Sequence, residues 1–311
     1  MSNPIINTIV FPIIRQDFIL PALKSLKVNT PPNYKTIVVN QTTSNEEFER
    51  ALYDSCDIVI RPHFNMGFAQ AANWGMRLAP TPYVTVANDD ILFLDNWWQG
   101  CMETFERFET AAAVCPMTPK EPGWGWGEPG YRHLVPRTFM NGELKRLYDE
   151  DRELMAMVKG GNQSATARYH DTQSALDRLI LEASSDPAFI QSLVEEKNWA
   201  VVDAFATFCP VFRADRLAEV GMIDERFFPG GGEDYDLMAR YYQAGYRMLS
   251  TSRSFVWHWW GKSKDSPDGR DMALPPARPN WNNLSALWTP RCDVWGKNCE
   301  RKTDEVFVAG L

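Results

Sequence analysis

The chain has 311 residues, a length that suits one large α/β domain with elaborations or two smaller domains. Apolar residues make up 44% of it, which excludes a largely disordered protein, and the net charge of −8 disfavours a polyanionic partner without excluding a local basic groove. There is no apolar run of about 18 residues that would predict a membrane span. The N-terminal residues lack the features of a signal peptide, and the six scattered cysteines favour reduced thiols, so we expect a cytosolic protein.

Strands and helices alternate at the start of the chain. Apolar, β-branched runs predict buried strands over 7–14, 34–45, 56–63 and 82–94. Helical spacing predicts helices over 17–29, with Asp17 as a candidate N-cap, and over 46–56 and 67–79. This alternation implies a parallel sheet with helices on both faces, in which ligands bind at the carboxyl ends of the strands. The polar clusters at 40–45 and 88–90 follow two of those ends.

The second part of the chain departs from this alternation. A helix and a strand are expected over 95–119, and a loop rich in glycine and proline over 120–137. Charged helical patterns then fill 141–198, and the α/β pattern resumes over 200–260. We therefore expect a main domain over 1–265 with a helical insertion at about 121–198. An irregular tail rich in tryptophan and proline, over 266–311, is expected to pack on that domain.

Four segments carry residue types suited to chemistry, and each also has a structural explanation. Asn88, Asp89 and Asp90 could hold Mg²⁺ or Mn²⁺ or could simply end a strand. The small residues of 65–73 let a helix N-terminus approach a ligand or pack tightly on a sheet. His258 stands among tryptophans, which favours the neutral imidazole that a metal needs, although a lone histidine often serves structure. Three carboxylates follow the glycines of 230–232, where acids also suit a helix N-terminus.

Together, these segments resemble glycosyltransferase family 2 in order and spacing. The matching stretches are "NMGFAQAAN" (65–73), "NDD" (88–90), "GEDYDLMARYYQAGY" (232–246) and "HWWGKS" (258–263). The resemblance covers roughly residues 5–120 and 200–263; the insertion and the tail have no counterpart in it. It implies the α/β fold of the GT-A type, a Rossmann-like and mostly parallel central sheet with helices on both faces, here with a helical insertion.

The resemblance also implies roles for individual residues. Asp234 resembles the catalytic base with Glu233 as its neighbour, and Asp90 and His258 resemble the metal ligands, although His258 could instead contact the diphosphate. The donor nucleotide would be contacted by residues after the first four strands, namely Phe11, Pro12, Gln41, Thr43, Asn65, Gly67, Phe68, Asn73, Asn88 and Asp89. The acceptor would lie near Trp124, Trp126, Gly231, Gly232 and Trp259.

The implied activity is metal-dependent, inverting transfer of a hexosyl or pentosyl group from a nucleoside-diphosphate sugar, with a UDP-type donor favoured and Mn²⁺ or Mg²⁺ as cofactor. This chemistry needs one base for the acceptor hydroxyl and a Lewis acid for the leaving diphosphate. A nucleotidyltransferase on a similar sheet and a non-catalytic binding module are alternatives. The acceptor stays open between a saccharide, another hydroxyl compound and modified nucleic acid, and so does the oligomeric state.

Overall fold

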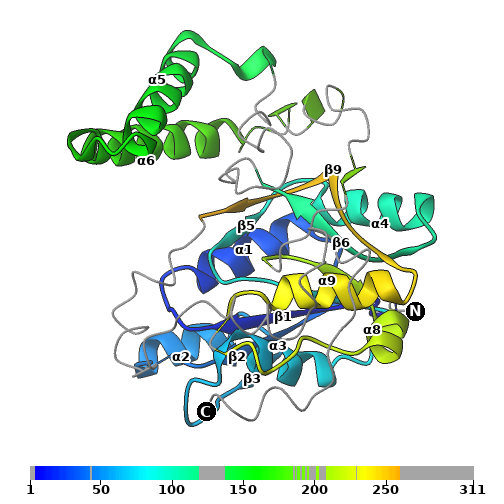
Figure 1. Cartoon of the computed structure of the whole chain (residues 1–311). Helices are drawn as coiled ribbons and strands as arrows, with labels where there is room; N and C mark the ends of the chain where they lie inside the picture. The colour runs from blue at the N-terminus through cyan, green and yellow to red at the C-terminus, as the bar shows by residue number, and fades with distance from the viewer. Residues whose placement is uncertain are drawn as a thin grey trace.

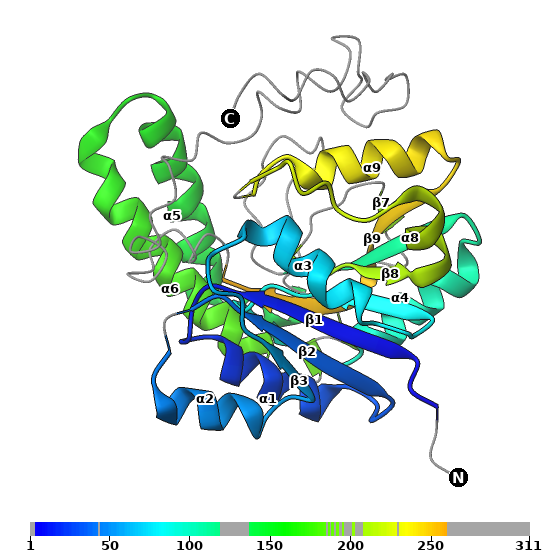
Figure 2. The same ribbon diagram turned by 90° about the horizontal axis from the view of Figure 1, so that it is seen from below.

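The computed structural model describes residues 4–118 except 43, residues 137–184, residues 208–259 except 229, and scattered positions between 186 and 202. Its first half is a parallel sheet in the order β3-β2-β1-β4, with β1 paired to both β2 and β4. The strands are β1 (Asn7–Ile13), β2 (Tyr34–Asn40), β3 (Ile58–Ile60) and β4 (Tyr83–Val86). Figure 2 shows α1 (Ile19–Asn29) and α2 (Glu46–Tyr53) on one face of these strands and α3 (Gly67–Arg77) on the other.

The second half makes the sheet mixed rather than mostly parallel. β8 (Val211–Arg213) runs antiparallel between β4 and β6 (Ala111–Met117). β9 (Arg247–His258) is parallel to β6 and antiparallel to β5 (Ile91–Phe93) and β7 (Val201–Val202). The chain reaches β8 from the insertion and not through a crossover helix. The rule that parallel strands are joined by right-handed crossovers therefore does not apply to β8. The α/β class with helices on both faces is confirmed.

The stretch 82–94 forms two strands, which corrects the single strand predicted there. β4 ends at Val86, and the backbone N–H of Ala87 still bonds to Val10 of β1, 2.8 Å away. β5 starts at Ile91, directly opposite His258 of β9. Residues 88–90 therefore connect two strands that pair with different neighbours, and this connection turns their side chains toward the carboxyl edge of the sheet.

The start of α1 also differs from the prediction. The helix begins at Ile19, Phe18 occupies the N-cap position, and no side chain caps the helix. Asp17 instead binds Arg15, with 2.7 Å between carboxylate and guanidinium. The Asp17 carboxylate thus forms an ion pair with a largely buried arginine and does not cap the helix.

The remaining helices pack on the second half of the sheet. They are α4 (Trp97–Arg107), α8 (Ala214–Val220) and α9 (Glu233–Gln243). α4 lies directly on β9, because a Cβ atom at Gly100 would come within 1.9 Å of the Arg253 carbonyl oxygen. Only glycine permits so close an approach. None of the described helices is long and apolar enough to cross a membrane, and the four described cysteines are free thiols.

Two insertion helices stand beside the sheet, α5 (Gly142–Lys159) and α6 (Thr166–Ser184), joined through the 3-10 turn Gln163–Ala165 (Figure 1). Another 3-10 turn, Arg137–Phe139, precedes them. Leu147, Leu176 and Ile180 share a hydrophobic cluster with Phe255 and Trp257 of β9. This cluster is separate from the main core around β1, β2 and β4. A third helix expected near 186–199 falls mostly outside the described residues, and so does the tail.

Candidate active site at the carboxyl edge of the sheet

Asp90 and His258 meet where β4 and β9 end. Asp90 is 1% exposed, and its Oδ1 lies 3.3 Å from Nε2 of His258. The backbone N–H of Trp259 donates to the Asp90 carbonyl oxygen over 3.0 Å, which extends the pairing of Ile91 with His258. Backbone pairing between β5 and β9 thus holds the two side chains together, although they are far apart in the sequence.

The imidazole of His258 is held on several sides. Its ring stacks on Phe208, with 4.8 Å between the ring centroids, and its backbone N–H donates to Thr118 Oγ1. Its Nε2 also lies 3.4 Å from the Asn88 side-chain nitrogen. Phe208 and Thr118 are site residues that sequence reasoning missed, because nothing in their local pattern distinguishes them from core positions.

This cluster leaves buried polar atoms without hydrogen bonds. Both carboxylate oxygens of Asp90 and Nδ1 of His258 are buried and have no hydrogen-bond partner. Asp90 Oδ1 and His258 Nε2, 3.3 Å apart, are therefore close enough for an ion pair, but the two groups are not aligned for a hydrogen bond. Burial would raise the pKa of Asp90, but His258 and Arg15 outweigh it and hold that pKa below its ordinary value. An ionised carboxylate with unmet oxygens suits a hard divalent cation.

The residues present fit such a cation, with a small protein ligand set. No group of three or more His, Cys, Asp or Glu side chains within the described ranges could hold a metal ion. A cation here would therefore rely on Asp90 and His258, with the Asn88 side chain nearby. The other positions would fall to water and to substrate oxygens, as is usual for Mg²⁺.

Asp89 faces the turn after β1. The pKa of Asp89 is raised to about 7, mainly by burial and by the neighbouring Asp90. Arg15 and the backbone N–H groups of Ile14 and Arg15 oppose that rise, so the carboxylate lies against this turn. Arg15 is 9% exposed, and its guanidinium lies 4.6 Å from the centre of the Phe18 ring. It is a third site residue that the sequence patterns did not reveal, although its place directly after the first strand could have indicated it.

Residues predicted to contact the donor nucleotide cluster in part. Gln41, at the end of β2, accepts a hydrogen bond from the backbone N–H of Met66 over 2.8 Å, while its buried Nε2 has no partner. Asn65 accepts from the N–H of Gly67 over 2.8 Å, and Gly67 has φ of 76°, which favours glycine. Half-buried Phe68 follows in the first turn of α3. These residues surround the junction of β2 and α3.

Other predicted donor residues lie in different surroundings. Pro12 is buried within β1, and the fully buried ring of Phe11 meets Phe93 edge to face, with 6.2 Å between centroids. Asn73 donates to the Ile223 carbonyl oxygen over 2.7 Å and to Glu225 over 3.0 Å. Phe11 and Asn73 therefore contact other protein groups, and their role in donor binding stays a prediction.

The carboxylates after the glycines begin α9, as the sequence pattern predicts. Gly231 and Gly232 have φ of 102° and 92°, and Glu233 is the first residue of the helix. Buried Glu233 accepts a hydrogen bond from the backbone N–H of Gly231. Half-buried Asp234 accepts from the N–H of Tyr235 over 2.9 Å. Asp236 is fully buried and pairs with Arg240 over 2.9 Å, which fastens the helix.

A series of contacts brings these acids to the edge that holds Asp90. A Cβ atom at Gly230 would lie 3.7 Å from Cβ of Phe68, so the glycine run touches the start of α3. That start is tied to the end of β2 through the bond between Met66 and Gln41. β2, β1 and β4 are parallel, so their carboxyl ends share one edge, and Asp90 follows β4. Figure 2 shows α9 and α3 on the same face of the sheet.

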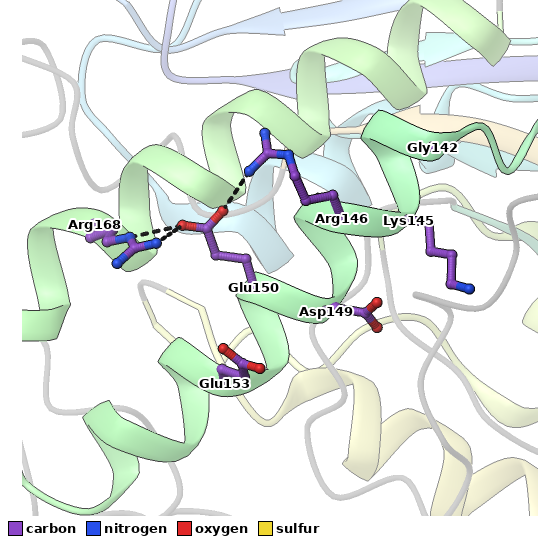
Figure 3. Close-up of a pocket in the computed structure, with 7 residues that line it drawn as sticks. All are labelled: Gly142, Lys145, Arg146, Asp149, Glu150, Glu153 and Arg168. Carbon is purple, nitrogen blue, oxygen red and sulfur yellow. Dashed lines mark hydrogen bonds and ion pairs between the residues drawn. The ribbon is translucent and has the colours of Figure 1, made fainter.

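Several predicted acceptor and donor residues lie outside the described residues, namely Thr43, Trp124 and Trp126. Trp259 is half-buried, and its ring packs 5.3 Å from that of Phe18. A separate open depression of about 520 Å³ lies on the insertion (Figure 3), lined by Gly142, Lys145, Arg146, Asp149, Glu150, Glu153 and Arg168. Arg146 and Arg168 both pair with Glu150 there, so the charges of this depression largely neutralise one another.

Comparison with solved structures supports the fold. The chain aligns with a crystal structure of GalNAc-T7 holding UDP, GalNAc and Mn²⁺ at a TM-score of 0.53 and 14% identity, over 83% of this chain and 44% of that one. It aligns with the mannosyltransferase PcManGT from Pyrobaculum calidifontis, in complex with GDP-Man and Mn²⁺, at 0.50 and 13% identity, over 91% and 68% of the two chains. The chain thus spans less than half of the first structure. Both are glycosyltransferases of the GT-A fold.

The sequence itself was compared with protein families and with curated proteins. No curated protein matches it significantly. Residues 8–169, about half of the chain, match the family described as glycosyl transferase family 2. That match includes β1 to β6 with the Asn88–Asp90 turn, and it extends into the insertion helices. The chain therefore belongs to glycosyl transferase family 2 and has a GT-A-like fold.

Proposed function

We propose that the protein is a metal-dependent, inverting glycosyltransferase that transfers a hexosyl or pentosyl group from a nucleoside-diphosphate sugar to an acceptor hydroxyl. The observation that carries this proposal is the buried pair of Asp90 and His258, whose unmet polar atoms lie at the carboxyl edge of the sheet. The contact of Gly230 with Phe68 ties the start of α9 to α3 at that edge. The similar GT-A structures that hold UDP or GDP-Man with Mn²⁺ add support for such a donor and cation.

Asp90 and His258 would hold the cation, Mn²⁺ or Mg²⁺. A bound divalent cation supplies Lewis-acid stabilisation to the departing nucleoside diphosphate. Arg15, whose charge acts on both Asp89 and Asp90, places a guanidinium at the same edge. We infer that Arg15 adds positive charge toward the diphosphate, in the manner of arginines that bind phosphate groups. Gln41 and the start of α3 would lie toward the nucleoside.

Asp234 is the proposed base. Inverting transfer needs one group to take the proton of the acceptor hydroxyl while its oxygen bonds to the sugar carbon and the bond from that carbon to the diphosphate breaks. No protein nucleophile takes part. Asp234 is more exposed than Glu233, whose carboxylate is bound to the Gly231 N–H. The N-terminus of α9 favours the ionised form that a base requires. Gly231 and Gly232 form a rim without side chains, over which an acceptor could lie.

Nucleotide and metal binding can be tested by the thermal shift of the full chain. We expect UDP or GDP to raise Tm with Mn²⁺ or Mg²⁺ present and much less with EDTA. A tight complex would add on the order of 2–4 kcal/mol at saturating ligand. A panel of nucleotide sugars, assayed for donor hydrolysis, would then identify the donor. The absence of any shift with every nucleotide and metal pair would contradict the proposal.

A further inference from the structure

The six residues 220–225, here named the connector, join α8 to the segment that leads into α9. Arg240 of α9 donates to three carbonyl oxygens of the connector: Met222 at 2.8 Å, Val220 at 3.3 Å and Gly221 at 3.4 Å. Arg240 also pairs with fully buried Asp236. One end of the connector is therefore bound to the helix that carries the proposed base.

The other end of the connector is bound to α3. Asn73, 2% exposed, donates from one side-chain nitrogen to the Ile223 carbonyl oxygen at 2.7 Å and to Glu225 Oε1 at 3.0 Å. Arg77, one turn further along α3, pairs with the same Glu225 oxygen at 2.7 Å. These bonds span about 150 positions in the sequence. A buried amide nitrogen needs acceptors, and here they come from the connector, while the buried Oδ1 of Asn73 has no hydrogen-bond partner.

The backbone between Glu225 and α9 contributes little stiffness. It contains Gly230, Gly231 and Gly232, of which the last two have φ of 102° and 92°. Glycine at positive φ is conformationally permissive, so this stretch does not by itself set where α9 begins. The place of the helix must come from its contacts. Its apolar face packs in the main core through Leu237, Met238 and Tyr241. Hydrogen bonds to the connector add to this packing, from α9 through Arg240 and from α3 through Asn73 and Arg77.

We propose that Asn73 and Glu225 are positioning residues that set the place of α9 relative to α3, and hence of the base relative to the donor. α3 suits this role because its first turn is tied to the end of β2, on the donor side, through Met66 and Gln41. The expected effect on catalysis rests on the proposed function, whereas the placing of α9 does not. A misplacement of about 1 Å at a reacting group can lower the rate about 100-fold, while donor contacts stay in place.

Three variants of the full chain test this clamp. Glu225→Ala removes the acceptor of Arg77 and one of the two acceptors of Asn73, whereas Glu225→Gln keeps an acceptor oxygen at the same position. Glu103→Ala is the matched control, because Glu103 accepts from Arg253 at 2.9 and 3.0 Å across a similar sequence span, at a partly exposed site between α4 and β9. The readouts are hydrogen exchange of the amides of residues 236–240 without ligand, and kcat and KM for a nucleotide sugar that the wild type consumes.

We expect Glu225→Ala to speed exchange at 236–240 and to lower kcat about 10- to 100-fold with donor KM within about threefold of wild type. Glu225→Gln should restore both readouts, and Glu103→Ala should change neither. Either of two results would overturn the proposal. The first is that the amides of 236–240 exchange no faster in Glu225→Ala than in Glu103→Ala. The second is that Glu225→Ala raises the donor KM and leaves kcat unchanged. If the wild type consumes no nucleotide sugar, the proposed function fails, and the exchange result still decides whether the clamp holds α9.

Discussion

At the scale of residues, the site departs from what a stable core would choose. A buried carboxylate without hydrogen bonds costs free energy of folding, and Asp90 has two such oxygens beside an imidazole with an unmet nitrogen. Buried polar groups without hydrogen bonds are typical of functional sites, where binding or catalysis requires them. Asp236 differs from Asp90, because this equally buried carboxylate forms a hydrogen-bonded ion pair with Arg240.

Replacing Asp90 should therefore affect nucleotide and metal binding much more than the stability of the free protein. We expect Asp90→Ala to lower the Tm of the protein in EDTA only slightly, because His258 and Arg15 favour the ionised carboxylate in the fold while its burial opposes it. The added stabilisation by UDP or GDP with Mn²⁺ should disappear. Asp149→Ala, an exposed carboxylate on α5, is the control and should change neither quantity. A large loss of Tm without any change in the nucleotide shift would assign Asp90 to structure alone.

Asp89 makes a prediction about pH. Its pKa of about 7 in the folded protein lies above the ordinary value of 3.8, so folding takes up a proton between these values. The contribution of Asp89 to stability is therefore full below about pH 4 and is lost as pH rises through 7. Asp89→Asn should reduce this decline in the free energy of unfolding, measured in urea with EDTA. An equal pH dependence in both proteins would show that Asp89 is not the group responsible.

At the scale of elements, a buried ion pair between Asp236 and Arg240 helps to hold α9. Asp236 is fully buried, so Arg240→Ala would remove the positive charge paired with its carboxylate and should cost about 3–5 kcal/mol of unfolding free energy. Arg146→Ala is the matched control, since Arg146 also pairs with a glutamate at i+4 but is 63% exposed. That exposed pair should be worth less than about 1 kcal/mol. Similar losses in the two variants, measured by denaturant unfolding, would contradict the assignment.

Much of this arrangement could be predicted from periodicity and from a few motifs. The first three strands, α3 and the start of α9 are where their patterns indicate, because short-range apolar spacing and glycine placement determine them. The pairing of β5 with β9 could not be predicted, because it depends on a partner more than 150 positions away. For the same reason the sequence could not show that Asn73 faces the connector or that Phe208 stacks on His258.

At the scale of the whole molecule, the insertion shares packing with the sheet. Leu176 and Ile180 of α6 are buried in one cluster with Phe255 and Trp257 of β9. The GT-A-like sheet and the insertion should therefore unfold together.

Truncating the insertion side of this cluster tests that expectation. Ile180→Ala should lower the free energy of unfolding by about 2–5 kcal/mol within a single transition. Met157→Ala, on an exposed position of α5, should have little effect. An early separate transition for the variant, seen by calorimetry, would mean that the insertion folds as its own unit.

The most direct test of the account is the behaviour of Asp234→Asn in the full chain. The amide keeps the size of the side chain but cannot take the proton of an acceptor hydroxyl. The account predicts that glycosyl transfer falls by a factor of about 100 or more, a typical loss for a general base, while the Tm shift with nucleotide and Mn²⁺ stays at the wild-type value. Transfer at close to the wild-type rate would contradict the assignment of Asp234 as the base.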